Sequence, residues 1–150
     1  MGYLIKCSSC KQDTWASNIV NLINDHTEKN GKIKCVACGS PKASIYQESN
    51  LQEKGETWGR YIKGVIPIET EFETYTPYIL LTAQTEDGEI DGIHFNYYKD
   101  TRKEGGKLKH GHGPGGAPVF NKDELFQLLE KLVAYGSFSK EDFTNFIKRI

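Results

Sequence analysis

In the middle of the chain, apolar and polar residues alternate with the period of a β-strand. Residues 58–66 have this pattern, and Pro67 predicts a sheet edge or an interruption, because proline cannot donate to a strand ladder. Residues 68–74 then alternate Ile, Thr, Phe and Thr with three glutamates, which predicts a strand with one packed and one acidic face. A flat strand face seldom converges on a cation, so we interpret the glutamates as a solvated edge.

A β-hairpin is predicted next. Residues 78–83 form a mostly apolar strand, the turn falls at 85–89, and residues 90–98 return. The return strand has two different faces: Ile93, Phe95 and Tyr97 on one, and His94, Asn96 and Tyr98 on the other. The polar and aromatic trio is a candidate binding face, and its alternative is the ordinary exposed face of a sheet.

Two amphipathic helices are predicted at the C-terminal end. Asn121 with Glu124, and Ser139 with Asp142, have the spacing of capping boxes, and Gly136 marks the end of the first helix. Both apolar stripes are expected to pack on the sheet. They consist of Leu125, Leu128, Leu129, Leu132 and Val133, and of Phe143, Phe146, Ile147 and Ile150.

All the cysteines lie near the N-terminal end, as two C-x-x-C pairs. They are Cys7 with Cys10 and Cys35 with Cys38. A tight C-x-x-C turn points both sulfurs inward, and two such turns complete a tetrahedron around one metal ion. Gly39 follows the second pair and eases its turn, whereas Lys11 stands at that position in the first pair.

The segment between the pairs is 24 residues long, against about 15–20 in common paired sites, and so indicates an insertion. Trp15, Ile19, Leu22, Ile23 and His26 share one helical stripe, which predicts an inserted helix capped by residue 13 or 14. Residues 32–34 and 43–47 alternate like a short hairpin with the second pair at its tip.

This arrangement resembles a zinc ribbon over residues 3–48. The resemblance implies Cys7, Cys10, Cys35 and Cys38 as ligands of one structural Zn²⁺ per chain. An iron site like that of rubredoxin uses the same ligands, although both of its turns usually carry the trailing glycine. A thioredoxin-like redox motif needs a single C-x-x-C and fits poorly.

Composition and charge narrow the class of protein. Hydrophobic residues make up 37% and charged residues 26%, as in a globular protein, and the formal net charge of −1 favours neither nucleic acid nor an anionic membrane. No apolar run reaches the roughly 18 residues that span a bilayer, and the N-terminus lacks a secretion signal, so we expect a cytoplasmic protein. Lysines surround the cysteines, but four thiolates with one Zn²⁺ carry a net negative charge that would offset the positive charge of these lysines.

Residues 100–119 contain six glycines and two prolines, which predicts a long irregular loop. Its Lys107, Lys109, His110 and His112 could contact a metal, an anion or a partner, or the loop could be a mobile surface segment.

We therefore predict an α+β protein with a zinc ribbon and inserted helix at 1–48, a linker or turn at 49–57, and a domain at 58–150. In the last part, a twisted antiparallel sheet carries two C-terminal helices. The predicted function is a zinc-binding interaction module without catalysis, contacting protein or nucleic acid, with protein slightly favoured, and not a membrane. One alternative is a small-molecule-binding domain or enzyme that uses loop 100–119 with His94, Asn96 and Tyr98. Another is a rubredoxin-like iron electron carrier.

Overall fold

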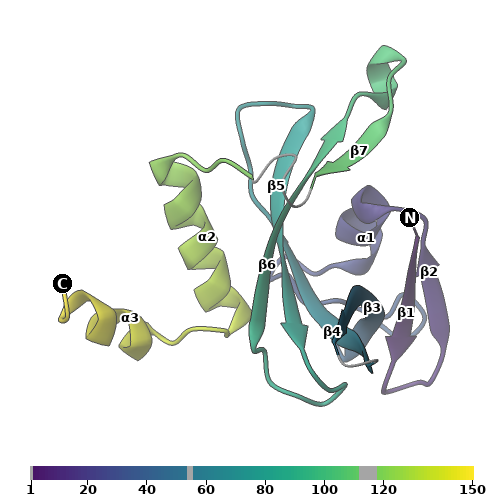
Figure 1. Ribbon diagram of the computed structural model, residues 1–150, viewed down its shortest axis with the longest axis horizontal. Coiled ribbons are helices and arrows are strands. Elements are labelled where there is room, and N and C mark those ends of the chain that lie inside the picture. The colour runs from purple at the N-terminus through teal and green to yellow at the C-terminus, as the bar shows by residue number, and fades with distance from the viewer. Residues whose placement is uncertain (1, 54–55, 112–117) are drawn as a thin grey trace.

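One antiparallel sheet organises the residues that the computed structural model describes, which are 2–53, 56–111 and 118–150. The seven strands lie in the order β2-β1-β3-β4-β5-β6-β7 (Figure 1). Their bounds are β1 Tyr3–Cys7, β2 Asp13–Ala16, β3 Ala43–Glu53, β4 Glu56–Pro67, β5 Tyr75–Ala83, β6 Gly92–Asp100 and β7 Leu108–Gly111. The helices are α1 Ile19–His26, α2 Lys122–Tyr135 and α3 Lys140–Ile147, with a 3-10 turn, η1, at Arg102–Glu104.

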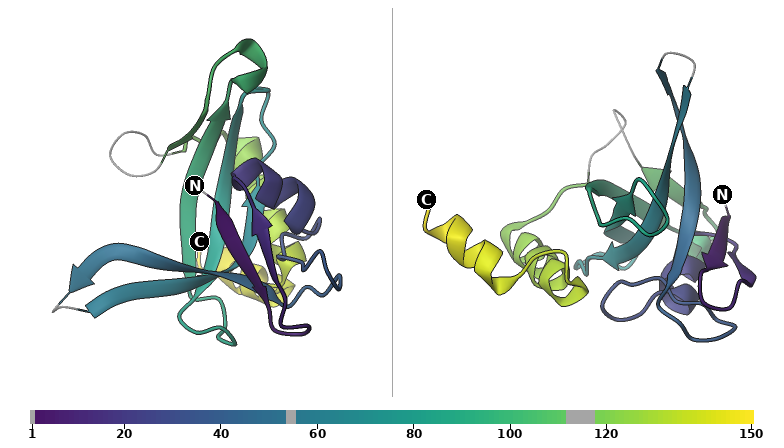
Figure 2. Two further views of the ribbon diagram at one scale, coloured as in Figure 1. Left: turned by 90° about the vertical axis from the view of Figure 1, so that its right-hand side faces the viewer. Right: turned by 90° about the horizontal axis from the view of Figure 1, so that it is seen from below.

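Helices cover the two faces of the sheet (Figures 1 and 2). On one face, α1 packs over a core that includes Ile5, Ile19 and Ile62. On the other face, Leu128 and Leu132 of α2 pack against apolar residues of β4 and β5. The α+β class is confirmed.

The sheet runs through the expected boundary between the two parts of the chain. Residues 49–53 belong to β3 and residues 56–57 to β4, and these strands pair with each other. The core under α1 joins residues of both parts, for example Ile5 and Ile33 with Val65 and Tyr78. The division into domains 1–48 and 58–150 stays a prediction.

The inserted helix exists but begins later than its apolar stripe predicts. Residues 13–16 form β2, in which Trp15 pairs with Leu4 of β1 and is exposed. Asn18 caps α1 by accepting the backbone N–H of Asn21 at 3.1 Å. Strand pairing and a better N-cap therefore move the start of the helix.

Residues 68–74 form no strand, and this prediction is wrong. The chain leaves the sheet after Pro67, and the Thr70 hydroxyl donates to the Tyr75 carbonyl at 2.9 Å and accepts the Phe72 N–H at 3.2 Å. Such local side-chain bonds stabilise a turn in place of a ladder. The three glutamates of this segment are exposed, as expected.

The hairpin expected around the second cysteine pair is also wrong. Ile33 forms a bridge with Thr27, and Lys32 forms one with Gly64, while residues 43–47 pair within β3 against β1 and β4. In the described strand pairs, residues 43–47 thus lie between β1 and the next strand, β4, and residues 32–34 pair with other segments.

Both C-terminal capping boxes are confirmed, and Gly136 ends α2 with φ of 94°. The packing of the two helices differs. α2 lies on the sheet, but α3 projects away from it (Figure 1), and none of the α3 residues is buried. The expectation that both helices pack on the sheet is therefore wrong for α3. Among the described helices, none has the length and apolar character needed to cross a membrane.

Candidate metal centre

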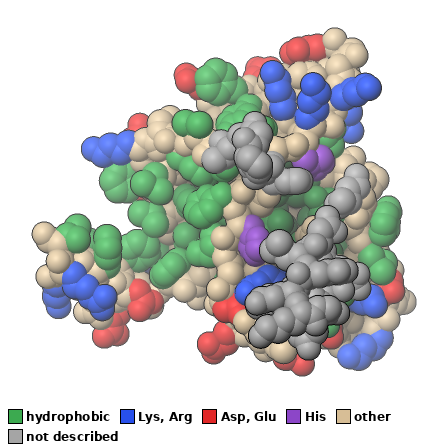
Figure 3. All heavy atoms as spheres, viewed as in Figure 1, with side chains coloured by type: hydrophobic (Ala, Val, Ile, Leu, Met, Phe, Trp, Pro, Cys, Tyr) green, Lys and Arg blue, Asp and Glu red, His purple; other side chains and the backbone are tan. Residues whose placement is uncertain are grey.

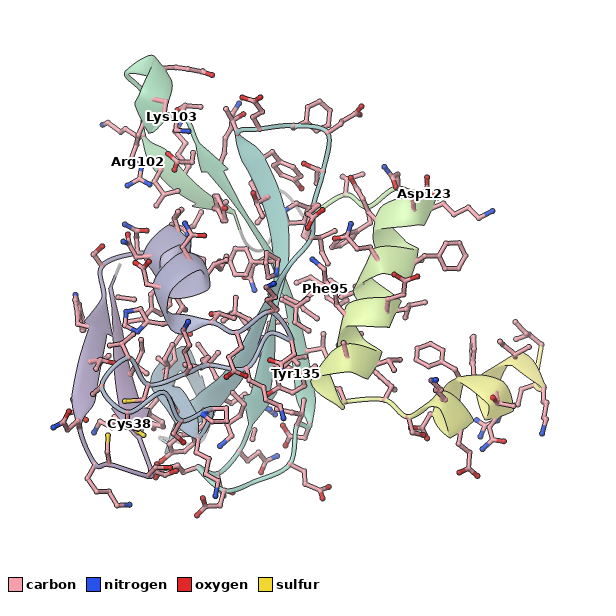
Figure 4. The ribbon with its side chains drawn as sticks, turned by 180° about the vertical axis from the view of Figure 1, so that it is seen from behind. Cys38, Phe95, Arg102, Lys103, Asp123 and Tyr135 are labelled. Carbon is pink, nitrogen blue, oxygen red and sulfur yellow. The ribbon has the colours of Figure 1, made fainter. Side chains whose placement is uncertain are left out.

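Two loops bring the four cysteines together. Cys7 ends β1 and Cys10 lies in the turn to β2, whereas Cys35 and Cys38 lie in the loop before β3. Because β1 pairs with β3 and Cys7 stands opposite Ala43, the two loops meet at the same end of the strands. Figure 4 shows the sulfur atoms gathered beside Cys38.

Backbone hydrogen bonds form both turns. The N–H of Lys11 donates to the Cys7 carbonyl at 3.0 Å, and the N–H of Gly39 donates to the Cys35 carbonyl at 2.7 Å. Gly39 has φ of 73°, the left-handed conformation that glycine adopts without strain. The predicted role of Gly39 in the turn is confirmed.

The distances between the sulfurs match a tetrahedral metal site. Cys7 Sγ lies 3.7 Å from Cys38 Sγ, and Cys10 Sγ lies 3.7 Å from Cys35 Sγ. All four ligand atoms lie within 4.8 Å of one another, and none of the cysteines forms a disulfide. Metal–sulfur bonds of about 2.3 Å give tetrahedral edges of roughly 3.8 Å. The residues therefore fit a four-coordinate metal ion with one sulfur from each cysteine.

Polar contacts join the two loops outside the cluster. The hydroxyls of Ser9 and Ser40 lie 2.9 Å apart, and Ser8 donates both its N–H and its hydroxyl to the Lys42 carbonyl, at 3.1 and 3.0 Å. Cys7 and Cys35 are buried in the core, while Cys38 is exposed. The cluster thus lies between the core under α1 and solvent.

The thiols differ in acidity. The backbone N–H of Cys10 lowers the pKa of Cys7 to about 7, with a further contribution from the Ser9 N–H. For Cys10, the Gln12 N–H favours the thiolate, but burial and the neighbouring sulfurs together raise its pKa to about 12. Crowded thiolates repel one another, and a cation at their centre removes that penalty.

The chemistry of such a cluster follows from its ligands. Four thiolates fill a tetrahedral coordination sphere and leave no position for water or substrate, as in structural rather than catalytic sites. A redox-active ion with these ligands could instead carry one electron.

The second set of predicted site residues lies on and beside β6 and β7, toward the opposite edge of the sheet from the cysteines. His94, Asn96 and Tyr98 share one face of β6, and His110 of β7 stands opposite Tyr98 on that same face. Lys109 stands opposite Lys99 and so belongs to the other face, and Lys107 precedes β7. His112 lies outside the described residues.

His94 belongs to a polar network that sequence patterns miss. Its Nε2 lies 3.1 Å from the Thr82 hydroxyl, which also accepts a hydrogen bond from Arg60 at 3.2 Å, and Arg60 forms an ion pair with Asp91. Burial and the nearby guanidinium lower the pKa of His94. The bonded pairs in this network are 12–31 positions apart in sequence, so only the strand register reveals them.

A groove of about 550 Å³ opens between β5, β6 and the start of α2. The rings of Tyr75 and Tyr97, whose centroids are 5.3 Å apart, form part of its wall. Its other lining residues are Glu71, Phe72, Thr74, Lys99, Val119, Asn121 and Glu124. No sequence motif marks this groove. Comparison of the chain with protein-family models, curated proteins and solved structures gave no match.

Proposed function

We propose that the four cysteines bind one structural Zn²⁺, and that the chain is a non-catalytic interaction module that contacts another protein. The observation that carries the proposal is the convergence of four sulfurs at the spacing of a tetrahedral metal site, with 3.7 Å between the sulfurs of Cys7 and Cys38. The cytoplasmic location expected from the sequence would keep these thiols reduced and available to the metal.

Zinc is favoured because closed sites of four cysteines are common structural zinc sites. Iron uses the same ligands. Lys11 forms the same backbone turn as Gly39, so the missing glycine does not separate the two metals. Metal analysis therefore has to identify the ion.

The ion would act as a cross-link. It would join the β1–β2 turn to the loop before β3, at the edge of the core under α1. Structural zinc sites contribute roughly 10–16 kcal/mol of apparent binding free energy, which is linked to folding. Cys7, Cys10, Cys35 and Cys38 would hold the metal, and no step of catalysis is assigned to it.

The exposed surface supports a macromolecular partner. Several large apolar side chains are among the exposed residues, and the net charge is only −1. Apolar exposure together with a nearly neutral charge favours protein over nucleic acid as the partner.

Elemental analysis of the purified chain, combined with thiol titration, tests the metal. We expect one zinc per chain and no reactive thiol until the metal is removed. Cys35→Ser should abolish stoichiometric binding, whereas Ser9→Ala in the other loop should retain it. A metal-free protein with four reactive thiols would refute the proposal, and one iron per chain would indicate electron transfer.

A second candidate function is ligand binding on the His94 face, and the observation that favours it is the network of Arg60, Thr82 and His94. Cationic and hydroxyl donors suit a small anion such as a carboxylate or phosphate, which would compete with Asp91 for Arg60. We expect such an anion to raise the Tm of the wild type but not of His94→Ala. Equal shifts in both proteins would rule this face out.

A further inference from the structure

Helix α3 and the residues that follow it carry an apolar stripe, the α3 stripe, that the described residues of the chain leave uncovered. The exposed fractions of Phe146, Ile147 and Ile150 are 57%, 64% and 89%. Phe143, the fourth member, contacts only the ring of Phe138 among the described aromatic pairs, with centroids 5.8 Å apart. An isolated helix of eight residues is marginal in water even with its capping box, so α3 needs a surface to pack on.

A second apolar surface lies on the same chain where α2 meets β6. We call it the α2–β6 patch and define it by Ile93, Phe95, Leu125 and Phe126, whose exposed fractions are 39%, 52%, 48% and 52%. Figure 3 shows hydrophobic side chains gathered over this region and continuing toward α3. The α2–β6 patch and the α3 stripe are thus two exposed apolar surfaces among the described residues.

The position of α2 explains why the patch is uncovered. Lys131 Nζ donates to the Pro67 carbonyl at 2.7 Å, and Gln127 accepts the Glu69 N–H at 2.8 Å. These bonds hold α2 toward the β4 side of the sheet. At the β6 side, Phe95 reaches Phe120 before the helix, with ring centroids 6.0 Å apart, but remains half exposed.

We propose that two copies of this chain associate about a two-fold axis, with α3 of each copy packed on the α2–β6 patch of the other. This rests on the proposed interaction role and names its partner as a second copy. A two-fold pair covers both surfaces on both chains at once, because an isologous interface repeats each contact. An unrelated partner would have to supply both a patch and a helix.

The exposed area is sufficient for such a dimer. A fully exposed large apolar residue offers about 180 Å². The seven exposed residues of the patch and the stripe therefore present on the order of 700 Å² per chain, and a standard interface buries about 800 Å² on each partner. Side chains at the rim would add the remainder.

The connection between α2 and α3 favours packing of α3 on a second chain over packing of α3 on its own chain. Gly136 turns the chain in the left-handed conformation, and the ring of Phe138 packs against Phe143. Together they direct α3 away from α2 of its own chain, as Figure 1 shows. The stripe is thus presented outward, where a second molecule can reach it.

Sedimentation equilibrium or light scattering of the full zinc-loaded chain over a concentration series tests the proposal. We expect the wild type to form a dimer with twice the mass of 16.9 kDa. Phe146→Glu should raise the dissociation constant by about 30-fold or more, since it places a charge in the apolar contact. Asn145→Glu, on the polar side of α3, should leave it unchanged. Residue 146 is exposed in the single chain, so far-UV circular dichroism should be the same for both variants.

A mixture of two variants tests whether α3 of one chain packs on the α2–β6 patch of the other. Phe95→Glu damages the patch and Phe146→Glu damages the stripe, so each variant alone should be monomeric. In a mixed pair, one intact patch faces one intact stripe, and we expect heterodimers to form. A wild type that stays monomeric, a dimer insensitive to both substitutions, or a mixture without heterodimers would overturn the proposal. The zinc content is measured on the same samples, so failure of the dimer stays distinguishable from failure of the metal site.

Discussion

Lys11 and Gly39 occupy equivalent positions in the two cysteine turns. Each follows the second cysteine of its pair and donates its N–H to the carbonyl of the first. Each has positive φ, 61° for Lys11 and 73° for Gly39. The turn geometry is thus the same in both loops although only one has a glycine, and Lys11 bears the strain of a left-handed conformation.

This equivalence predicts opposite effects of two substitutions. Lys11→Gly should stabilise the zinc-loaded protein by about 0.5 kcal/mol, because relief of strain exceeds the entropy that glycine costs. Gly39→Lys should destabilise it by a similar ~0.5 kcal/mol, because the same strain and entropy act in the reverse direction and a Cβ at position 39 meets open space. Urea unfolding monitored by circular dichroism measures both. Destabilisation by Lys11→Gly would show that the lysine side chain contributes more than its backbone costs.

Local signals in the sequence predicted the parts of the structure that local chemistry determines. The spacing of the cysteines predicted their convergence, and the capping residues Asn121 and Ser139 marked where α2 and α3 begin. In the hairpin of β5 and β6, Ile93, Phe95 and Tyr97 share one face, as predicted, because alternate residues of a strand lie on the same side of the sheet.

Contacts between distant segments could not be predicted in this way. The pairing of β1 with β3 and the Lys32–Gly64 bridge join residues more than 30 positions apart. The alternation at 68–74 imitated a strand, but the Thr70 hydroxyl stabilises a turn there. The stripe of α3 has the period of a packed helix, and its periodicity does not say which surface, or which copy, covers it.

Removal of the metal should loosen the core under α1 before the core under α2. The first core contains Cys7 and Cys35 together with Ile5 and Ile62, whereas the second contains Ile79 and Leu128 and no cysteine. We expect chelation to increase amide hydrogen exchange in β1 and α1 strongly and in α2 weakly. Uniform loss of protection would mean that the whole sheet unfolds as one unit.

Gly64 of β4 and Tyr135 of α2 should be energetically coupled. A Cβ atom at position 64 would overlap the ring of Tyr135, so Gly64→Ala should cost about 1–3 kcal/mol. In a Tyr135→Ala background, the same change should cost much less, because the ring is absent. Urea unfolding of the four proteins gives the coupling. Equal costs in both backgrounds would contradict the packing of α2 on β4.

The buried His26 should make stability depend on pH. His26 is 6% exposed, and its Nδ1 has no hydrogen-bond partner among the residues that the structure describes. Burial lowers the pKa of His26 from 6.5, with Lys34 acting in the same direction and Asp25 opposing. The unfolded chain therefore binds a proton more readily, and stability present above pH 6.5 is lost as the pH falls toward the lower folded pKa.

The His26→Leu variant isolates this effect, since both proteins keep the same metal ligands. We expect the unfolding free energy of the wild type to fall more steeply than that of His26→Leu between pH 7 and about pH 5.5, the lower part of the range in which histidine titrates. Zinc content is followed at each pH, and only samples that retain the metal are compared. Parallel curves for the two proteins would show that His26 is protonated equally in the folded and unfolded states, and that its burial has no electrostatic cost.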